Sequence, residues 1–113
     1  MYRAGDYCMP HSHRRSDASV IYMLDPGDAH DPGTKTLAGA LGFADARIDY
    51  CCAHEAGRVT RLYFPQMLAG TMLVFSGEYV HFVNPYFGER PRITLSWNIT
   101  LSPLPGDPAE GWT

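Results

Sequence analysis

The most constraining feature of this sequence is a strictly alternating segment near its C-terminal end. Between residues 92 and 99 the polar positions are Arg92, Thr94, Ser96 and Asn98. The intervening apolar positions are Ile93, Leu95, Trp97 and Ile99. Because successive side chains of a strand point to opposite faces, the pattern predicts a strand with one polar and one apolar face. We expect this last strand to run over residues 92–101.

The rest of the sequence consists of shorter β-type runs separated by turn residues. Candidate strands lie at residues 19–24, 48–53, 59–64, 71–75 and 80–83, and residues 37–45 form either a short strand or a small-residue helix. Gly, Pro, Asn and Asp stand between these runs. About seven short strands joined by turns predict an all-β fold with little helix, either a β-sandwich or a jelly roll.

Length and charge limit the classes of function. The 113 residues predict one domain, at residues 1–102, followed by a Pro- and Gly-rich tail at 103–113 that frays. The net charge of −3 without a long charge run argues against nucleic-acid and membrane-surface roles. No apolar run is long enough to cross a bilayer.

The N-terminus and the cysteines predict a cytoplasmic protein. The first ten residues lack the apolar core of a secretory signal. The three cysteines are Cys8, Cys51 and Cys52, an odd count without a C-x-x-C motif. Reduced thiols are the simplest interpretation.

Three histidines form a candidate metal site. His11 and His13 are two residues apart, so on an extended segment both side chains point to the same face. His81 lies near the end of an apolar run and would be the third ligand. Three protein ligands leave coordination positions open, as in catalytic metal sites. The alternative is that His11 and His13 belong to a solvated turn beside Arg14 and Arg15.

Arg92 is a candidate anion-binding residue. Ten residues separate it from His81, and it begins the polar face of the alternating strand. If that face looks into the interior, the buried guanidinium needs an anion, from either a protein carboxylate or a ligand. Thr94, on the same face, adds a hydroxyl donor. The alternative is an exposed edge strand with a surface arginine.

These residues together resemble the iron(II)- and 2-oxoglutarate-dependent oxygenases over about residues 2–100. Tyr2-x-x-Gly5-Asp6 followed by Pro10-His11-x-His13 is similar to the family's Y-x-x-G-D and P-H-x-D segment. Residues 39–47, GALGFADAR, are similar to the G-x-L-x-F-x-D-P-R stretch of one bacterial and phage branch. Residues 65–81 look like its P-x-x-G-x-L-V-x-F…H strand pair. His81-x10-Arg92-x-Thr94 matches its H-x10-R-x-S/T spacing.

The resemblance implies a double-stranded β-helix, which is a form of jelly roll. It implies that His11 and His81 bind Fe(II), and that Arg92, assisted by Thr94, binds the distal carboxylate of the cosubstrate 2-oxoglutarate. Tyr22 is a further candidate for this carboxylate. The implied activity is that of a dioxygenase, which hydroxylates a small-molecule or peptide substrate and releases CO2 and succinate. We expect the loops at residues 25–36 and 50–58 to line the mouth of the site.

The sequence departs from the family pattern in two ways. His13 replaces the usual carboxylate ligand, so we expect either His13 or Asp17 to bind the metal, and we favour His13. Family members also carry N-terminal helices that cover one face of the barrel, whereas this sequence begins at the motif. We therefore expect the apolar face of residues 93–99 to be covered by a second copy of the chain, in a homodimer or a larger assembly.

Two other functions fit parts of the sequence. Gly5-x5-His11-x-His13-x3-Asp17 and Gly70-x10-His81 resemble the two cupin motifs. A cupin would use Asp17 as a metal ligand and would need no 2-oxoglutarate. The second alternative is a metal-free jelly-roll module that binds a small molecule or a partner chain.

Overall fold

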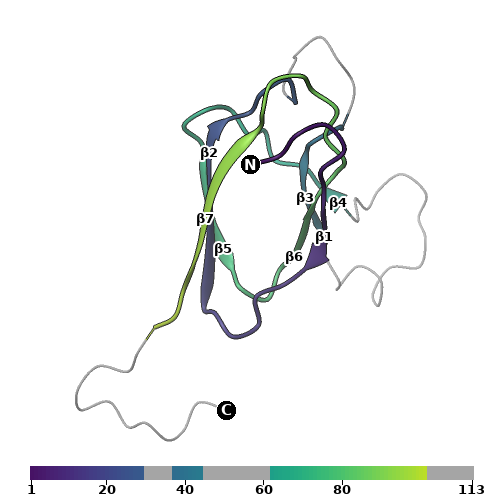
Figure 1. Cartoon of the computed structure of the whole chain (residues 1–113). Coiled ribbons are helices and arrows are strands. Elements are labelled where there is room, and N and C mark those ends of the chain that lie inside the picture. The colour runs from purple at the N-terminus through teal and green to yellow at the C-terminus, as the bar shows by residue number, and fades with distance from the viewer. Residues whose placement is uncertain (30–36, 45–61, 102–113) are drawn as a thin grey trace, which may run out of the picture.

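In the part of the chain that the structure describes, seven strands form two antiparallel sheets that face each other (Figure 1). The computed structural model describes residues 1–29, 37–44 and 62–101, and no helix occurs among them. One sheet has the order β1-β6-β3-β4 and the other β5-β2-β7. The strands are β1 (Cys8–His11), β2 (Ala18–Asp25), β3 (Leu41–Ala44), β4 (Leu62–Tyr63), β5 (Met72–Ser76), β6 (Val80–Val83) and β7 (Ile93–Ile99). The predicted all-β class is confirmed.

Most predicted strands within the described residues are found. The run at 80–83 is β6, the run at 19–24 lies within β2, and the run at 71–75 overlaps β5. The alternating segment contains β7, and residues 37–45 contribute the strand β3. β4 is the described part of the run at 59–64. The expected strand at 48–53 and the tail at 103–113 lie outside the described residues.

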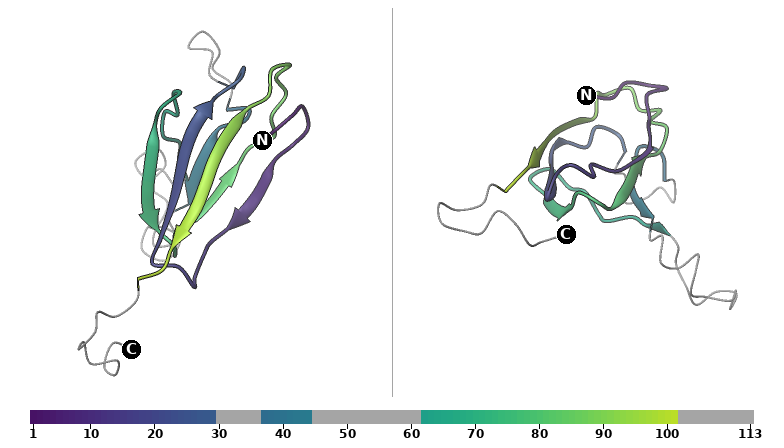
Figure 2. Two further views of the ribbon diagram at one scale, coloured as in Figure 1. Left: turned by 60° about the vertical axis from the view of Figure 1, so that its left-hand side comes forward. Right: turned by 90° about the horizontal axis from the view of Figure 1, so that it is seen from below.

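The interior between the sheets is apolar at one end and polar at the other. On β2 and β7 the paired positions Ser19 and Asn98, Ile21 and Ser96, and Met23 and Thr94 follow one another along the inner face. Met23 is buried with Leu41, Met67 and Val83 in the apolar core, at the Thr94 end of this row. The polar pair of Ser19 and Asn98 lies towards the opposite end, where the interior has room for a site. Figure 2 shows the two sheets as separate layers.

The outer face of the second sheet is apolar and exposed. Tyr22 on β2 lies between Leu95 of β7 and Met72 of β5. Trp97 comes two residues after Leu95 on β7 and therefore lies on this same face. Leu95 is 51% exposed and Trp97 is 45% exposed. The expected apolar face is therefore present and open, and the homodimer stays a prediction.

We expect two copies of the chain to pair through this face. Light scattering at micromolar concentration should then give the mass of a dimer. The Leu95→Glu variant should give the mass of a monomer, because it places a charge in the middle of the contact. Leu68→Glu, which changes an exposed leucine in the connection between β4 and β5, is the matched control and should stay dimeric. A wild-type chain of monomeric mass would contradict the prediction.

Tyr86 fixes the loop that leads into β7. Its side chain is only 1% exposed, and its hydroxyl accepts a hydrogen bond from the Asp28 N–H at 2.9 Å. The same hydroxyl donates to the Arg90 carbonyl. Gly27 lies against this hydroxyl with a φ of 60°, so a side chain there would be strained and would collide with the tyrosine. Through this hydroxyl, the loop that follows β2 and contains Asp28 is joined to the loop that contains Arg90, just before Arg92.

Removing this hydroxyl should destabilise the fold. Tyr86→Phe leaves the Asp28 N–H and the Arg90 carbonyl without their partner, which costs about 1–3 kcal/mol of unfolding free energy. Urea denaturation followed by circular dichroism measures the change. Tyr7→Phe removes a hydroxyl from an exposed tyrosine and should change stability by less than about 0.5 kcal/mol. Equal stability of the two variants would show that the Tyr86 hydroxyl does not fix the loop.

Candidate metal centre

The pairing of β1 with β6 brings the first two histidines together. His11 and His81 are direct partners in the antiparallel register, so their side chains lie on the same face of the sheet. Their ring centroids are 4.3 Å apart. Two histidines that are seventy residues apart in the sequence thus become neighbours through backbone hydrogen bonding alone.

The third histidine is positioned by a turn. β1 ends at His11, so His13 lies beyond the strand, and its N–H donates to the Gly77 carbonyl at 2.7 Å. The Ser16 N–H donates to the His13 carbonyl at 2.8 Å. A Cβ on Gly77 would come within 2.6 Å of the His13 carbonyl oxygen, so only glycine allows this approach. The expected convergence of His11 and His13 is found, but a turn produces it and not a continuous strand.

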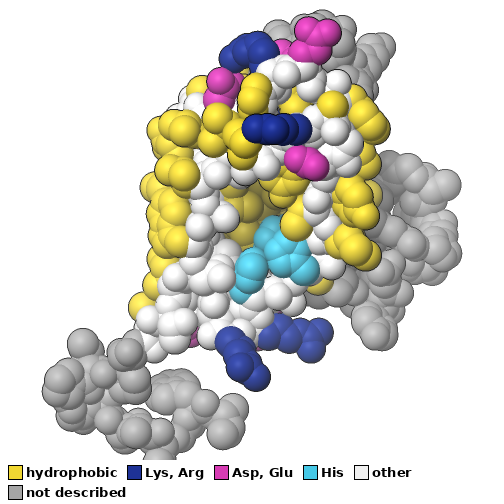
Figure 3. All heavy atoms as spheres, in the orientation of Figure 1, with side chains coloured by type: hydrophobic (Ala, Val, Ile, Leu, Met, Phe, Trp, Pro, Cys, Tyr) yellow, Lys and Arg dark blue, Asp and Glu magenta, His cyan; other side chains and the backbone are white. Residues whose placement is uncertain are grey.

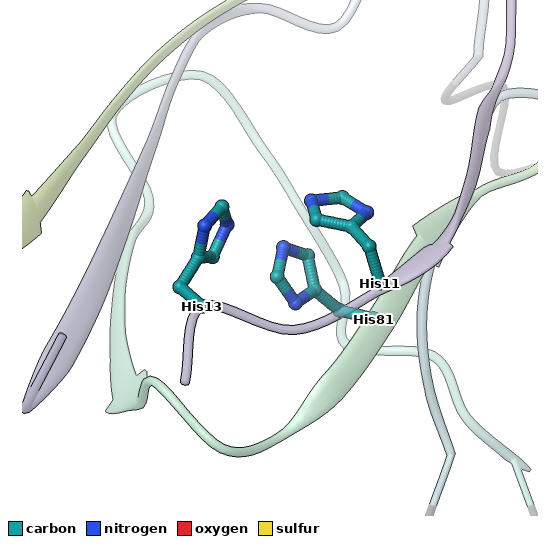
Figure 4. A group of neighbouring side chains, drawn as sticks. All are labelled: His11, His13 and His81. Atoms are coloured by element: carbon teal, nitrogen blue, oxygen red, sulfur yellow. The ribbon is translucent and has the colours of Figure 1, made fainter. Parts of the chain in front are cut away.

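The three imidazoles point towards one another (Figure 4). The His13 ring centroid is 5.0 Å from that of His11 and 5.2 Å from that of His81. One ligand nitrogen from each residue lies within 4.8 Å of the others. Metal–nitrogen bonds of about 2.0–2.1 Å place ligand nitrogens about 3–3.4 Å apart. Small ring rotations are therefore enough to form a three-histidine site.

Backbone carbonyls hold two of the rings in the tautomer that a metal requires. Nδ1 of His11 lies 2.8 Å from the Met9 carbonyl oxygen, and Nδ1 of His81 lies 3.1 Å from the Tyr79 carbonyl oxygen. A carbonyl only accepts, so in both rings Nδ1 carries a proton, and Nε2 is the nitrogen that remains to bind a metal when the ring is neutral. Metal-binding histidines in proteins commonly have such a partner on the second nitrogen.

The surroundings of His81 favour the neutral imidazole. Burial lowers its pKa, and the adjacent His11 and His13 lower it further, while the Tyr79 carbonyl acts in the opposite direction. The rings of Phe43 and Phe75 have their centroids 6.1 and 5.0 Å from the His81 ring. A neutral histidine within an apolar wall is a ligand that needs no proton removed before it binds a cation.

A cavity of about 170 Å³ lies between the sheets and contains the three histidines in its lining. The polar residues of the alternating segment also line it: Arg92, which precedes β7, and Thr94, Ser96 and Asn98 on β7. The predicted inward direction of this face is confirmed. In Figure 3 a hollow with apolar walls opens towards the viewer, and the histidines lie along its margin. The edge strands β1 and β7 border this hollow.

Arg92 is buried in the cavity wall without a full set of partners. It is 1% exposed, and its Nε has no hydrogen-bond acceptor among the described residues. The guanidinium lies over the Tyr2 ring, 5.1 Å from the centroid. Burial lowers the pKa of Arg92, against the opposing effect of Tyr2 and Tyr86. A desolvated cation with a free donor on a cavity wall is a binding site for an anion.

Two predicted site residues are not brought to the histidines. The Asp17 carboxylate accepts a hydrogen bond from the Leu101 N–H at 2.6 Å, and Asp17 is not part of the histidine cluster. Tyr22 lies on the outer apolar face between Leu95 and Met72 and does not line the cavity. The expectation that Tyr22 reaches a ligand carboxylate is therefore not supported, because the parity of β2 turns it away from the interior.

The structure adds three residues that the sequence analysis did not assign to the site. Asn98 Nδ2 lies 3.4 Å from His13 Nδ1, and the buried Ser19 hydroxyl donates to Asn98 Oδ1 at 2.9 Å. Cys8 lines the cavity with its Sγ 3.6 Å from His11 Nδ1. The alternation of residues 92–99 already placed Asn98 on the polar face, but no sequence signal linked it to His13.

Comparison with known proteins gives no further assignment. No family model matches the sequence, and no curated protein is significantly similar to it. The part of the chain that the structure describes has no helix that could cross a membrane.

The histidine cluster predicts how metal affinity responds to substitution. Changing any one of the three histidines to alanine should weaken Zn(II) or Co(II) binding by more than about 100-fold, since losing an outer partner of a ligand already costs about 10–100-fold. Asp17→Asn should leave the affinity unchanged. Isothermal titration calorimetry measures both. If Asp17→Asn weakens binding as much as His13→Ala does, the carboxylate is a ligand and the all-histidine set is wrong.

Proposed function

We propose that this protein is a non-haem iron(II)- and 2-oxoglutarate-dependent oxygenase with a double-stranded β-helix fold. One observation carries the proposal: a three-histidine cluster and a buried arginine with a free donor line the same cavity. The first feature suits a divalent cation and the second suits a carboxylate. A ligand that offers both a metal-chelating end and a distal carboxylate would satisfy both at once.

The strand order supports the proposed fold. The chain crosses between the two sheets from β1 to β2, from β2 to β3, and again at β5, β6 and β7. This alternation, with antiparallel pairing in both sheets, is what a double-stranded β-helix requires. The histidines of β1 and β6 and the arginine that precedes β7 then point into one interior.

The donor set fits Fe(II). Imidazole nitrogen is a suitable ligand for first-row divalent metals, and three protein ligands leave positions for a chelating cosubstrate and oxygen. Three neutral imidazoles also leave the full charge of the cation uncompensated. Together with the Arg92 guanidinium, this makes the cavity strongly attractive to a dianion such as 2-oxoglutarate.

The remaining residues have defined tasks in this proposal. Arg92 binds the distal carboxylate and Thr94 donates its hydroxyl to it. The cavity exceeds by about tenfold the ~10–15 Å³ that one water needs, so a small organic acid has room. The rings of Phe43 and Phe75 exclude water from the His81 side. Bound iron and 2-oxoglutarate would supply the chemistry of hydroxylation with dioxygen as the oxidant, one oxygen atom passing to the substrate and the other to succinate, with CO2 released.

The substrate would enter between β1 and β7. These are edge strands of different sheets, and the cavity between them is open in Figure 3. A small molecule or a peptide segment can reach the histidines from this side. The loop at 50–58 that was expected at the mouth lies outside the described residues, as does most of the loop at 25–36.

Anaerobic titration with Fe(II) tests the proposal. A visible charge-transfer absorption should form only when both Fe(II) and 2-oxoglutarate are present. Arg92→Ala, and Arg92→Met as a variant that preserves volume, should weaken 2-oxoglutarate binding by about 10–100-fold, the value of a lost charged hydrogen bond. Metal affinity should be retained in both. Arg3→Ala, at an exposed arginine, is the control.

The other outcomes identify the alternatives. Metal binding that is indifferent to 2-oxoglutarate supports a cupin-type protein and overturns the oxygenase. A chain that binds no metal is a jelly-roll binding module. If the arginine variants keep the full effect of 2-oxoglutarate, the role of Arg92 is wrong.

A further inference from the structure

We propose that Asn98, held by Ser19, is a positioning residue that orients His13 as the third metal ligand. This inference rests on the metal site of the proposed function and deepens it, because it explains how a histidine serves where the resembling family has a carboxylate.

Ser19 fixes the side chain of Asn98. The two residues are direct partners in the antiparallel register of β2 and β7, and both line the cavity. Ser19 is 2% exposed, and its hydroxyl donates to Asn98 Oδ1 at 2.9 Å. Since a buried hydroxyl that loses its partner costs free energy, this contact holds the amide in place although Asn98 itself is exposed.

Asn98 in turn meets the His13 ring. The amide nitrogen lies 3.4 Å from His13 Nδ1. A half-turn of the amide exchanges its oxygen and nitrogen, after which Oδ1 accepts a proton from Nδ1 and the amide donates to the Ser19 hydroxyl. In that arrangement His13 carries its proton on Nδ1 and offers Nε2 to a metal. The network therefore satisfies the ligating tautomer without moving any backbone atom.

His13 depends on this contact in a way that the other two ligands do not. His11 and His81 are oriented by backbone carbonyls two residues before them, at Met9 in β1 and at Tyr79 in the turn before β6. The backbone of His13 is fixed by Gly77 and Ser16, but among the described residues the only hydrogen-bond partner recorded for its ring is Asn98. Besides the ring contacts with His11 and His81, Asn98 is therefore the described residue whose hydrogen bond orients the His13 ring.

The test measures Co(II) affinity of the full chain by competition with a chromophoric chelator, and records the visible Co(II) spectrum. Asn98→Ala should weaken binding by about 10–100-fold, as expected for loss of an outer partner of a ligand. Asn98→Asp should retain affinity, because its carboxylate accepts the same proton. Ser96→Ala, on the same face of the same strand, is the matched control and should not change affinity.

A double variant separates positioning from a general structural role. If Asn98 acts through His13, then adding Asn98→Ala to His13→Ala should cause no further loss of Co(II) affinity. The Co(II) spectrum of Asn98→Ala should also resemble that of His13→Ala. Additive losses, or an Asn98→Asp variant as weak as Asn98→Ala, would overturn the positioning role.

The two proposals fail in different ways. A wild-type chain that does not bind Co(II) removes the metal site itself, and the positioning role with it. A wild-type chain that binds Co(II), with Asn98→Ala binding equally well, overturns only the role of Asn98.

Discussion

The antiparallel pairing of β1 with β6 is the interaction on which the site depends. It places His11 opposite His81, and a shift of one residue would turn one of the two side chains to the other face of the sheet. β3 pairs with the other edge of β6 and places Phe43 beside His81. Two of the three candidate metal ligands, and the Phe43 ring beside them, thus follow from the register of one sheet. The second sheet contributes the polar inner positions of β7, which are Thr94, Ser96 and Asn98.

The polar side chains on that inner face explain why apolar side chains do not fill the whole interior between the sheets. Apolar side chains pack against Met23 at one end of β2, whereas Ser19 and Asn98 lie at the other. Arg92 lies between the apolar core and the cavity that contains the histidines. It lines this cavity and also a second pocket beside the core. Among the described residues no carboxylate pairs with the buried guanidinium, and the Tyr2 ring offsets only part of the desolvation cost, which leaves an unfavourable term. An anionic ligand would remove it, which couples ligand binding to stability.

The sequence predicted the all-β class and the histidines that the structure brings together, and each difference from the structure has a physical cause. The alternation of residues 92–99 predicted which side chains share a face, but it left open whether the polar face is turned inward or exposed. The β2 segment, in contrast, is apolar at nearly every position, so its period does not reveal which face is buried, and Tyr22 was assigned to the wrong side. His13 was expected on a strand but lies in a turn that depends on Gly77, a contact between residues 64 positions apart. Local patterns carry no information about such contacts.

The three candidate ligands also differ in which part of the fold orients their rings. The carbonyls that orient His11 and His81 are part of the strands and the turn that form the sheet, so these rings cannot be released without disturbing the backbone. His13 is oriented by a side chain on an exposed position of an edge strand. Substitutions at Asn98 can therefore alter the third ligand while leaving the sheet intact. A carboxylate ligand would need no such tautomer control, because both of its oxygens accept. Replacing it by histidine makes the site dependent on an outer residue, and β7 is the strand that can supply one.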